Sequence, residues 1–356
     1  MAIGTDETIY FGVNLEDVSG RLYATNAITG FFRKWDFPHP VRVAPVVRSD
    51  GSVLVASGHI LSALSTNGAV EWTFNTGNPD DQPGTPLTGG PILDQLGNIY
   101  FVDLAGVFYA LAPDGKERWP SRRLGYRADA SPAIGENDIL YALAVDEGPA
   151  GPALHVYALD LKREGALVWT APVLLPPQDI YSSPVIGARG GIYFGGIGRF
   201  YAVIDEGASG RLAWSYDVEE HVFSAPLLTT DGVLYFGSGA AGIAGRFYAL
   251  QASEPPANSF WPMFRRDPRR SGNVVGGNEP PKVTLTKPAA GARFPAPASV
   301  SLEATASDPD GSVKQVEFFV DAISAGVDST APFAATSRLL DAGTYVLTAR
   351  ASDDRG

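Results

Sequence analysis

Cysteine is absent from all 356 residues of the chain. Its absence excludes disulfide bonds, thiolate nucleophiles and cysteine-ligated metal sites. Long hydrophobic runs are absent too, because no stretch approaches the roughly 18 apolar residues that a membrane-spanning helix requires. The start, Met1 to Gly4, lacks the charged and then apolar pattern of a signal peptide. We therefore expect neither a transmembrane segment nor a leader within this chain.

Positive charge is scarce in this sequence. Lysine and arginine number 27 against 39 aspartates and glutamates, which gives a formal net charge of -12. Nucleic-acid binding depends on lysine and arginine to neutralise phosphates, so an acidic surface argues against such a partner. We expect a monomer that binds no nucleic acid.

Glycine and proline are plentiful, and a repeat organises them. The 40 glycines, 28 prolines and 11% aromatic residues indicate short strands joined by many turns, so an all-β fold is expected. Residues 182–214 recur in degenerate copies, each with a proline and an apolar pair, an aromatic strand, an aromatic–alanine strand and a closing tryptophan. The tryptophans are Trp35, Trp72, Trp119, Trp169, Trp214 and Trp261, separated by 37, 47, 50, 45 and 47 residues.

The repeat predicts a β-propeller. The units cover residues 1–37, 43–75, 88–120, 129–172, 181–218 and 223–264. Four short strands per unit at this period are typical of propeller blades, which bury their aromatic residues against one another. We therefore predict a propeller of six four-stranded blades over residues 1–272, or an incomplete ring of seven or eight blades in a fragment of a longer protein.

A glycine precedes four of the closing tryptophans by four residues. These glycines are Gly68, Gly115, Gly165 and Gly210. A tight turn at each one would let the tryptophan that follows pack against the neighbouring blade. We interpret all six tryptophans as structural, because a ligand site would not be copied in every unit.

The strings SSPVIGARGGIYFGG and FYAVIDEGASGRLAW resemble the pyrroloquinoline-quinone-type propeller repeat. That repeat occurs in quinoprotein dehydrogenases and in non-catalytic relatives such as the lipoprotein of the outer-membrane barrel assembly machinery. The segment that starts at Trp261, WPMFRRDPRRSG, resembles a motif that flanks such propellers. The resemblance implies a propeller fold and a secreted, periplasmic or cell-surface location.

A second β unit follows a glycine- and proline-rich linker at residues 273–281. Apolar residues alternate with period two through residues 282–356, which predicts a β-sandwich. The strings ATASDPDGSVKQVEFFVD and AGTYVLTARASDDRG resemble a bacterial immunoglobulin-like domain, here without its last strand.

Two groups of charged residues are candidate binding sites, one in each predicted domain. Arg265, Arg266, Arg269 and Arg270 form a basic cluster that would suit an anionic partner, although bridges to carboxylates are the more common role of such residues. Asp308, Asp310, Asp353 and Asp354 fall at one end of the predicted sandwich and would suit calcium, although an ordinary aspartate turn is the more common role of residues such as the first two.

No constellation of residues predicts catalysis. The resemblance offers a quinoprotein dehydrogenase as one hypothesis, but that family's paired cysteines are missing. The carboxylates Asp94, Asp103, Asp146 and Asp205 fall at strand ends or turns and form no recurring cluster. We predict no catalytic residue and no bound cofactor, with calcium in the immunoglobulin-like domain as the one exception to test.

The sequence thus predicts a binding scaffold. Loops at one end of the propeller would bind a protein or polysaccharide partner, since loops on a rigid scaffold vary without unfolding it. The immunoglobulin-like domain would serve as a spacer or adhesion unit. Two alternatives stay open: an accessory part of a larger polysaccharide-degrading enzyme, and a calcium-dependent quinoprotein dehydrogenase.

Overall fold

The computed structural model describes residues 1–4, 8–15, 19–26, 32–41, 43–77, 85–148, 151–173, 182–240, 243–266, 281–307 and 313–353. The chain divides into two compact units, Met1–Val275 and Gly276–Gly356. The described ranges contain 29 strands and two short 3-10 helices, η1 (Glu136–Asp138) and η2 (Leu161–Arg163), which confirms the all-β fold. No described helix has the length and hydropathy to cross a bilayer. The predicted linker lies outside the described residues, except for Pro281.

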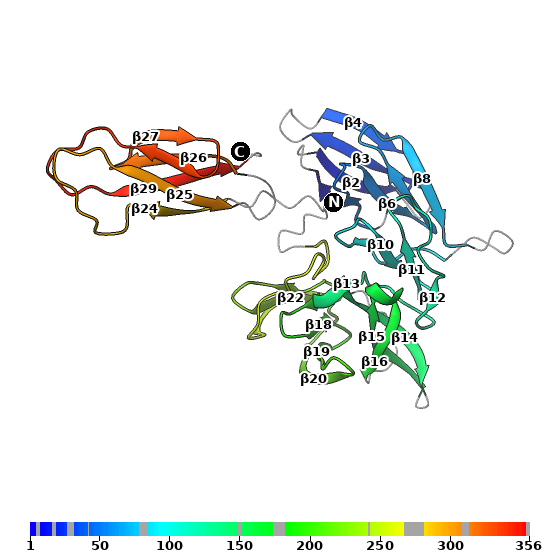
Figure 1. Ribbon diagram of the computed structural model, residues 1–356. Helices are drawn as coiled ribbons and strands as arrows, with labels where there is room; N and C mark the ends of the chain where they lie inside the picture. The colour runs from blue at the N-terminus through cyan, green and yellow to red at the C-terminus, as the bar shows by residue number, and fades with distance from the viewer. Residues whose placement is uncertain are drawn as a thin grey trace. The chain divides into compact units, whose positions relative to one another are not determined.

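The first unit consists of six antiparallel sheets that follow one another in chain order (Figure 1). Blade one contains β1 (Ala2–Ile3), β2 (Thr8–Leu15), β3 (Ser19–Asn26) and β4 (Phe32–Phe37). Blade two contains β5 (Val46–Val47), β6 (Val53–Ser57), β7 (Ile60–Leu64) and β8 (Val70–Asn75). Blade three contains β9 (Ile92–Leu93), β10 (Ile99–Val102), β11 (Val107–Leu111) and β12 (Arg122–Arg123).

The other three sheets repeat this order. Blade four contains β13 (Ala133–Ile134), β14 (Ile139–Gly148), β15 (Gly151–Asp160) and β16 (Ala166–Val173). Blade five contains β17 (Val185–Ile186), β18 (Gly191–Gly195), β19 (Arg199–Asp205) and β20 (Gly210–Asp217). Blade six contains β21 (Leu227–Leu228), β22 (Val233–Ala240) and β23 (Ile243–Gln251).

Blade six therefore differs from the prediction of four strands per blade. Its sheet is three-stranded, and β23 is its edge strand. The sequence analysis placed Trp261 at the end of a fourth strand, but this residue belongs to no strand and is 1% exposed. The predicted period failed here because the chain turns inward after β23 instead of back along the sheet.

Neighbouring blades pack together because each sheet that lies between two others buries both of its faces. In blade five, Phe194 and Tyr201 pack into the core shared with blade four. Tyr193 and Phe200 point the other way, into the core shared with blade six. Successive residues of a strand alternate between faces, so the aromatic pairs of the repeat supply both interfaces at once.

Each glycine of the Gly-x-x-x-Trp motif lies against the tryptophan of the preceding blade. A Cβ atom added at Gly68, Gly115, Gly165 or Gly210 would lie 2.7, 2.5, 3.1 or 2.2 Å from the ring of Trp35, Trp72, Trp119 or Trp169, respectively. Three of the indole nitrogens also donate hydrogen bonds across the interface. Trp35 donates to the Thr66 carbonyl (2.8 Å), Trp72 to the Pro113 carbonyl (3.1 Å) and Trp169 to the Asp205 carboxylate (2.9 Å). The turn glycine thus provides a flat surface for the neighbouring ring.

Two buried tyrosines of blade five should respond oppositely to loss of the hydroxyl. The Tyr201 hydroxyl has no hydrogen-bond partner among the described residues, whereas the Tyr193 hydroxyl donates to Glu254 at 2.5 Å. We expect Tyr201→Phe to stabilise the unit by up to about 1 kcal/mol, because it removes an unpaired polar group. Tyr193→Phe should cost about 1–3 kcal/mol, because it removes one hydrogen bond from the buried Glu254 carboxylate and leaves, among the described residues, only that from the Arg189 amide.

Denaturant titration of the two variants checks this expectation. Each replacement is conservative and lies in the same sheet, so each variant controls for the other. Loss of stability in Tyr201→Phe would contradict the structural description of that hydroxyl.

The second unit is a two-layered β-sandwich. One sheet has the order β24 (Lys282–Lys287), β25 (Ser301–Ser307) and β28 (Phe333–Thr336). The other has the order β27 (Ile323–Asp328), β26 (Val313–Val320) and β29 (Leu347–Asp353). Alternate residues such as Leu302, Val316 and Phe318 form a core of their own, as the period-two pattern predicted.

Candidate functional site

The inner strands of the blades surround a stretch of the chain's own backbone, residues 252–266, which we call the axial segment. Its Ala257 amide donates to the Ile186 carbonyl at 2.8 Å, and the Ile186 amide donates to the Pro262 carbonyl at 2.8 Å. Further along, the Ile134 amide donates to the Trp261 carbonyl at 2.7 Å. Because Ile186 and Ile134 belong to the inner strands of blades five and four, the axial segment crosses the centre of the unit.

Two side chains of the axial segment fill that centre. Trp261 is 1% exposed and joins the core of blades two to four, whereas Met263, at 2%, joins the core of blades five and six. The cavity beside Trp261 has a volume of only about 10 Å³. Such a space holds at most about one water molecule.

Five carboxylates of the first unit each accept a hydrogen bond from a tyrosine and do not cluster with one another. The pairs are Tyr100 with Asp94, Tyr109 with Asp103, Tyr157 with Asp146, Tyr141 with Asp205 and Tyr193 with Glu254. Burial, followed by the neighbouring carboxylate, raises the pKa of each of these tyrosines. The hydroxyls therefore stay protonated and donate, which makes these pairs structural.

These observations test the fit of a calcium-held quinone, which the propeller resemblance implies. No group of three or more histidines, aspartates or glutamates lies close enough to hold a metal within the described ranges. The axial position contains Trp261, and Asp94, Asp103, Asp146 and Asp205 are each committed to a tyrosine. The residues present do not fit the quinone and its ion.

The arginine cluster is only partly described. Arg269 and Arg270 lie outside the described residues. Arg265 lines the small cavity beside Trp261, and Arg266 places its guanidinium 5.1 Å from the centre of the Phe260 ring. Both arginines are half-buried and already interact with other groups of the chain. An anionic partner at this cluster stays a prediction.

The candidate calcium residues are not brought together by described structure. Asp308, Asp310 and Asp354 lie outside the described residues. Asp353 ends β29, but its side chain is also outside the description. Calcium binding in the second unit therefore stays a prediction.

Blade six exposes an aromatic face that the repeat buries elsewhere. Tyr235 and Phe247 occupy the positions that Tyr193 and Phe200 hold in blade five. In blade five these residues are 3% and 0% exposed, but Phe247 is 74% exposed. Tyr235 and Phe247 stack on each other at 5.8 Å. We call this surface, together with Ala249, the end face of blade six.

The end face is not predicted by the repeat pattern of the sequence. The residue four positions before Trp261 is Ala257, whereas Gly68, Gly115, Gly165 and Gly210 hold that position before their tryptophans. A missing turn glycine alone does not indicate a missing fourth strand, because Phe31 holds that position before Trp35 and blade one still has β4.

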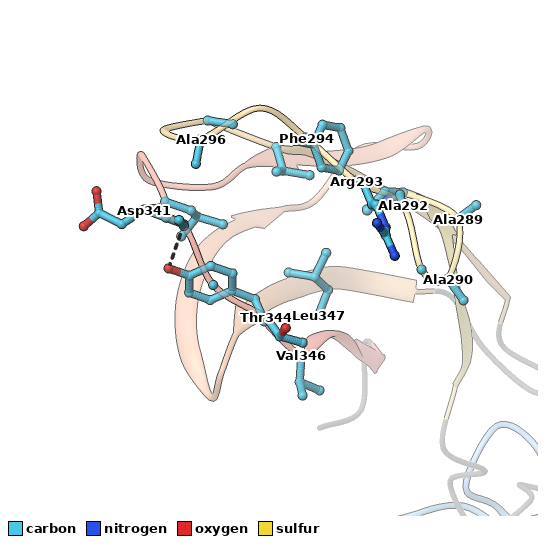
Figure 2. A pocket seen from close by; sticks show the side chains of 18 of the residues that line it. Ala289, Ala290, Ala292, Arg293, Phe294, Ala296, Asp341, Thr344, Val346 and Leu347 are labelled. Atoms are coloured by element: carbon cyan, nitrogen blue, oxygen red, sulfur yellow. Dashed lines mark hydrogen bonds between the residues drawn. The ribbon is translucent and has the colours of Figure 1, made fainter.

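The second unit contains an open cleft of about 1020 Å³ between residues 288–298 and 340–347. Figure 2 shows Arg293 and Phe294 on one side of it and Thr344 and Leu347 on the other. The Tyr345 hydroxyl donates to the Asp341 carbonyl at 3.2 Å, and alanines form much of the remaining wall. A cleft of this size with a few polar groups could hold a small ligand.

Comparison with protein-family models identifies both units. Residues 56–204 match the family described as outer membrane protein assembly factor BamB, and residues 281–349 match the bacterial Ig domain. The chain joins a BamB-like propeller to a bacterial Ig domain. Both assignments agree with the resemblances seen in the repeat and in the second unit.

Comparison with solved structures finds proteins that are similar in fold to the BamB-like propeller. The crystal structure of BamB from Moraxella catarrhalis is 17% identical and covers 70% of this chain and 72% of its own, with a TM-score of 0.50. At this identity the likeness concerns the fold alone. A europium-containing methanol dehydrogenase is 14% identical over 65% of this chain and 71% of its own, but its TM-score of 0.40 carries no argument. No curated protein sequence matches the chain.

Proposed function

We propose that this chain is a non-catalytic binding scaffold of the bacterial cell envelope or secreted fraction. The observation that carries the proposal is the axial segment, because Trp261 and Met263 are buried in it where the resemblance to quinoprotein dehydrogenases would place a quinone. The match to the BamB family and the aromatic end face of blade six support a protein partner. The immunoglobulin-like unit would act as a spacer or adhesion module.

A thermal-unfolding series tests this proposal. The full chain is heated in chelator, in calcium, and in calcium with excess pyrroloquinoline quinone. A ligand at 100 times its dissociation constant would stabilise the fold by about 2.7 kcal/mol, so binding is easily detected. We expect the quinone to leave the melting temperature unchanged.

Two other outcomes have defined meanings. A rise with quinone would overturn the scaffold proposal and require dehydrogenase assays. A rise with calcium alone that disappears in a variant lacking Asp308 and Asp310 would place an ion in the second unit and leave the scaffold proposal intact.

A further inference from the structure

The third and fourth strands of four blades pair in a fixed register. In each of these blades an alanine of the third strand lies directly opposite the tryptophan of the fourth. The pairs are Ala24 with Trp35, Ala63 with Trp72, Ala158 with Trp169 and Ala202 with Trp214. A β-bulge follows the alanine in all four. Residues directly opposite each other share a face, so each tryptophan ring lies on the same face as its alanine.

A tyrosine of the second strand completes this arrangement. Tyr10, Tyr141 and Tyr193 pair across the sheet with Ala24, Ala158 and Ala202, respectively. Their ring centres lie 5.7, 5.9 and 6.0 Å from those of Trp35, Trp169 and Trp214. In these three blades a tyrosine–alanine pair on two adjacent strands marks the position of a tryptophan on the fourth. In blade three Tyr100 pairs with Ala110 and lies 6.0 Å from Trp119, but that tryptophan belongs to no strand.

Blade six has the tyrosine–alanine pair without the tryptophan. Tyr235 lies opposite Ala249, in the register of the other blades. Ala249 is exposed, and β23 pairs only with β22 among the described residues. An edge strand beside an exposed aromatic face is a template for strand addition.

The exposure of Trp214 in blade five independently indicates the same binding site. In the earlier interfaces the turn glycine of one blade covers the tryptophan of the blade before it. No described glycine lies in this way beside Trp214, which is 36% exposed, whereas Trp119 and Trp169 are 8% and 5% exposed. A fourth strand on blade six would bring its glycine to Trp214 and its tryptophan to Tyr235.

We infer that blade six binds an extended segment of a partner protein, which pairs antiparallel with β23 and carries the motif Gly-x-x-x-Trp. The tryptophan would lie opposite Ala249 and against Tyr235, and the glycine against Trp214. This inference rests on the proposed scaffold function and names its partner chemistry. Backbone hydrogen bonds to an edge strand supply affinity in such complexes, and side-chain positions supply specificity.

The occupant is a different protein and not a second copy of this chain. The motif-bearing strands β8, β16 and β20 are already paired with the third strands of their own blades. Charge also defines the segment: in blade five, Arg199 at the start of the third strand pairs with Asp217 after the tryptophan. Arg246 holds the corresponding position in blade six and pairs with Glu219 of this chain at 2.6 Å, so a carboxylate three residues after the partner's tryptophan would compete with Glu219 for it.

The probe is a fluorescent peptide with the sequence of residues 209–218, which contains the complete motif of blade five. We expect saturable binding to the full chain by fluorescence polarisation. Replacing the peptide tryptophan by alanine should weaken binding about tenfold or more, since the aromatic contact and its burial are lost. Replacing the peptide glycine by valine should weaken it comparably, because the valine side chain would collide with Trp214.

Two variants of the chain test where on blade six the peptide binds. Tyr235→Ala should weaken binding about tenfold, and Ala249→Tyr should block it, because the added ring occupies the space of the peptide tryptophan. Both positions are incompletely buried, so these variants should fold. Tyr23→Ala is the matched control, since Tyr23 is a partly exposed tyrosine on the opposite face of blade one.

Hydrogen exchange provides the second readout. Bound peptide should protect amides of β23 and leave the edge strands of the second unit unchanged. Absence of saturable binding, or equal binding of the tryptophan-to-alanine peptide, would overturn the inference. Binding that survives both Tyr235→Ala and Ala249→Tyr would overturn it as well. The quinone titration decides the scaffold proposal separately, so the two failures are distinguishable.

Discussion

Replacing Trp261 with alanine is expected to destabilise the first unit by about 3–5 kcal/mol. Trp261 is almost completely buried and packs against blades two, three and four at once. Its removal would leave a cavity where inner strands converge, and these strands cannot move together to fill it. Thermal unfolding of the full chain should show a decrease in melting temperature of roughly 10 °C.

Two further variants test whether the large loss of stability is specific to removal of the Trp261 side chain. Trp214→Ala should cost less, roughly 2–3 kcal/mol, because that ring is already 36% exposed. Trp261→Phe should retain most of the stability, since the Trp261 indole nitrogen has no hydrogen-bond partner among the described residues. Equal losses in Trp261→Ala and Trp214→Ala would show that the axial position has no special role.

Gly115→Ala is expected to destabilise the first unit by about 2–4 kcal/mol. Gly115 has φ +84°, a conformation that costs a residue with a side chain roughly 1–2 kcal/mol. In addition, the new methyl group would lie 2.5 Å from the ring of Trp72, which would have to move away from its interface. Denaturant titration measures the sum of the two effects.

The chain offers a matched control for the backbone effect. Gly207 has φ +85°, and a Cβ atom there would meet nothing within 4 Å. Gly207→Ala should therefore cost only the roughly 1–2 kcal/mol of backbone strain. The difference between the two variants measures the glycine–tryptophan contact, and equal losses would contradict its contribution to blade packing.

The sequence allowed most of the fold to be predicted, because each blade repeats local signals. Alternating strands, turn glycines and a closing tryptophan recur together, and the structure has sheets at all six units. The second unit could be predicted from period-two alternation alone. These signals involve residues that are close together in the chain, so they can be recognised in a single sequence.

The candidate site was not predictable in the same way. Trp261 follows the spacing of the other tryptophans, yet it packs at the centre through contacts with strands far away in sequence. The exposure of Phe247 depends on the absence of a neighbouring strand, and a residue identical in type to its buried counterpart cannot report that absence. The missing glycine at position 257 does not indicate the difference by itself, because blade one also lacks a glycine four residues before Trp35 and has a fourth strand.

The axial segment has a consequence for the order in which the first unit becomes stable. In a stack of repeats each unit contacts its neighbours, and stability accumulates from one unit to the next. The axial segment joins distant repeats: Ser259 donates to the Ile134 carbonyl across 125 residues of sequence. These contacts form only after almost the whole first unit has been synthesised. Blades that emerge early would therefore stay able to separate until the last residues of the unit bind between them and make its unfolding cooperative.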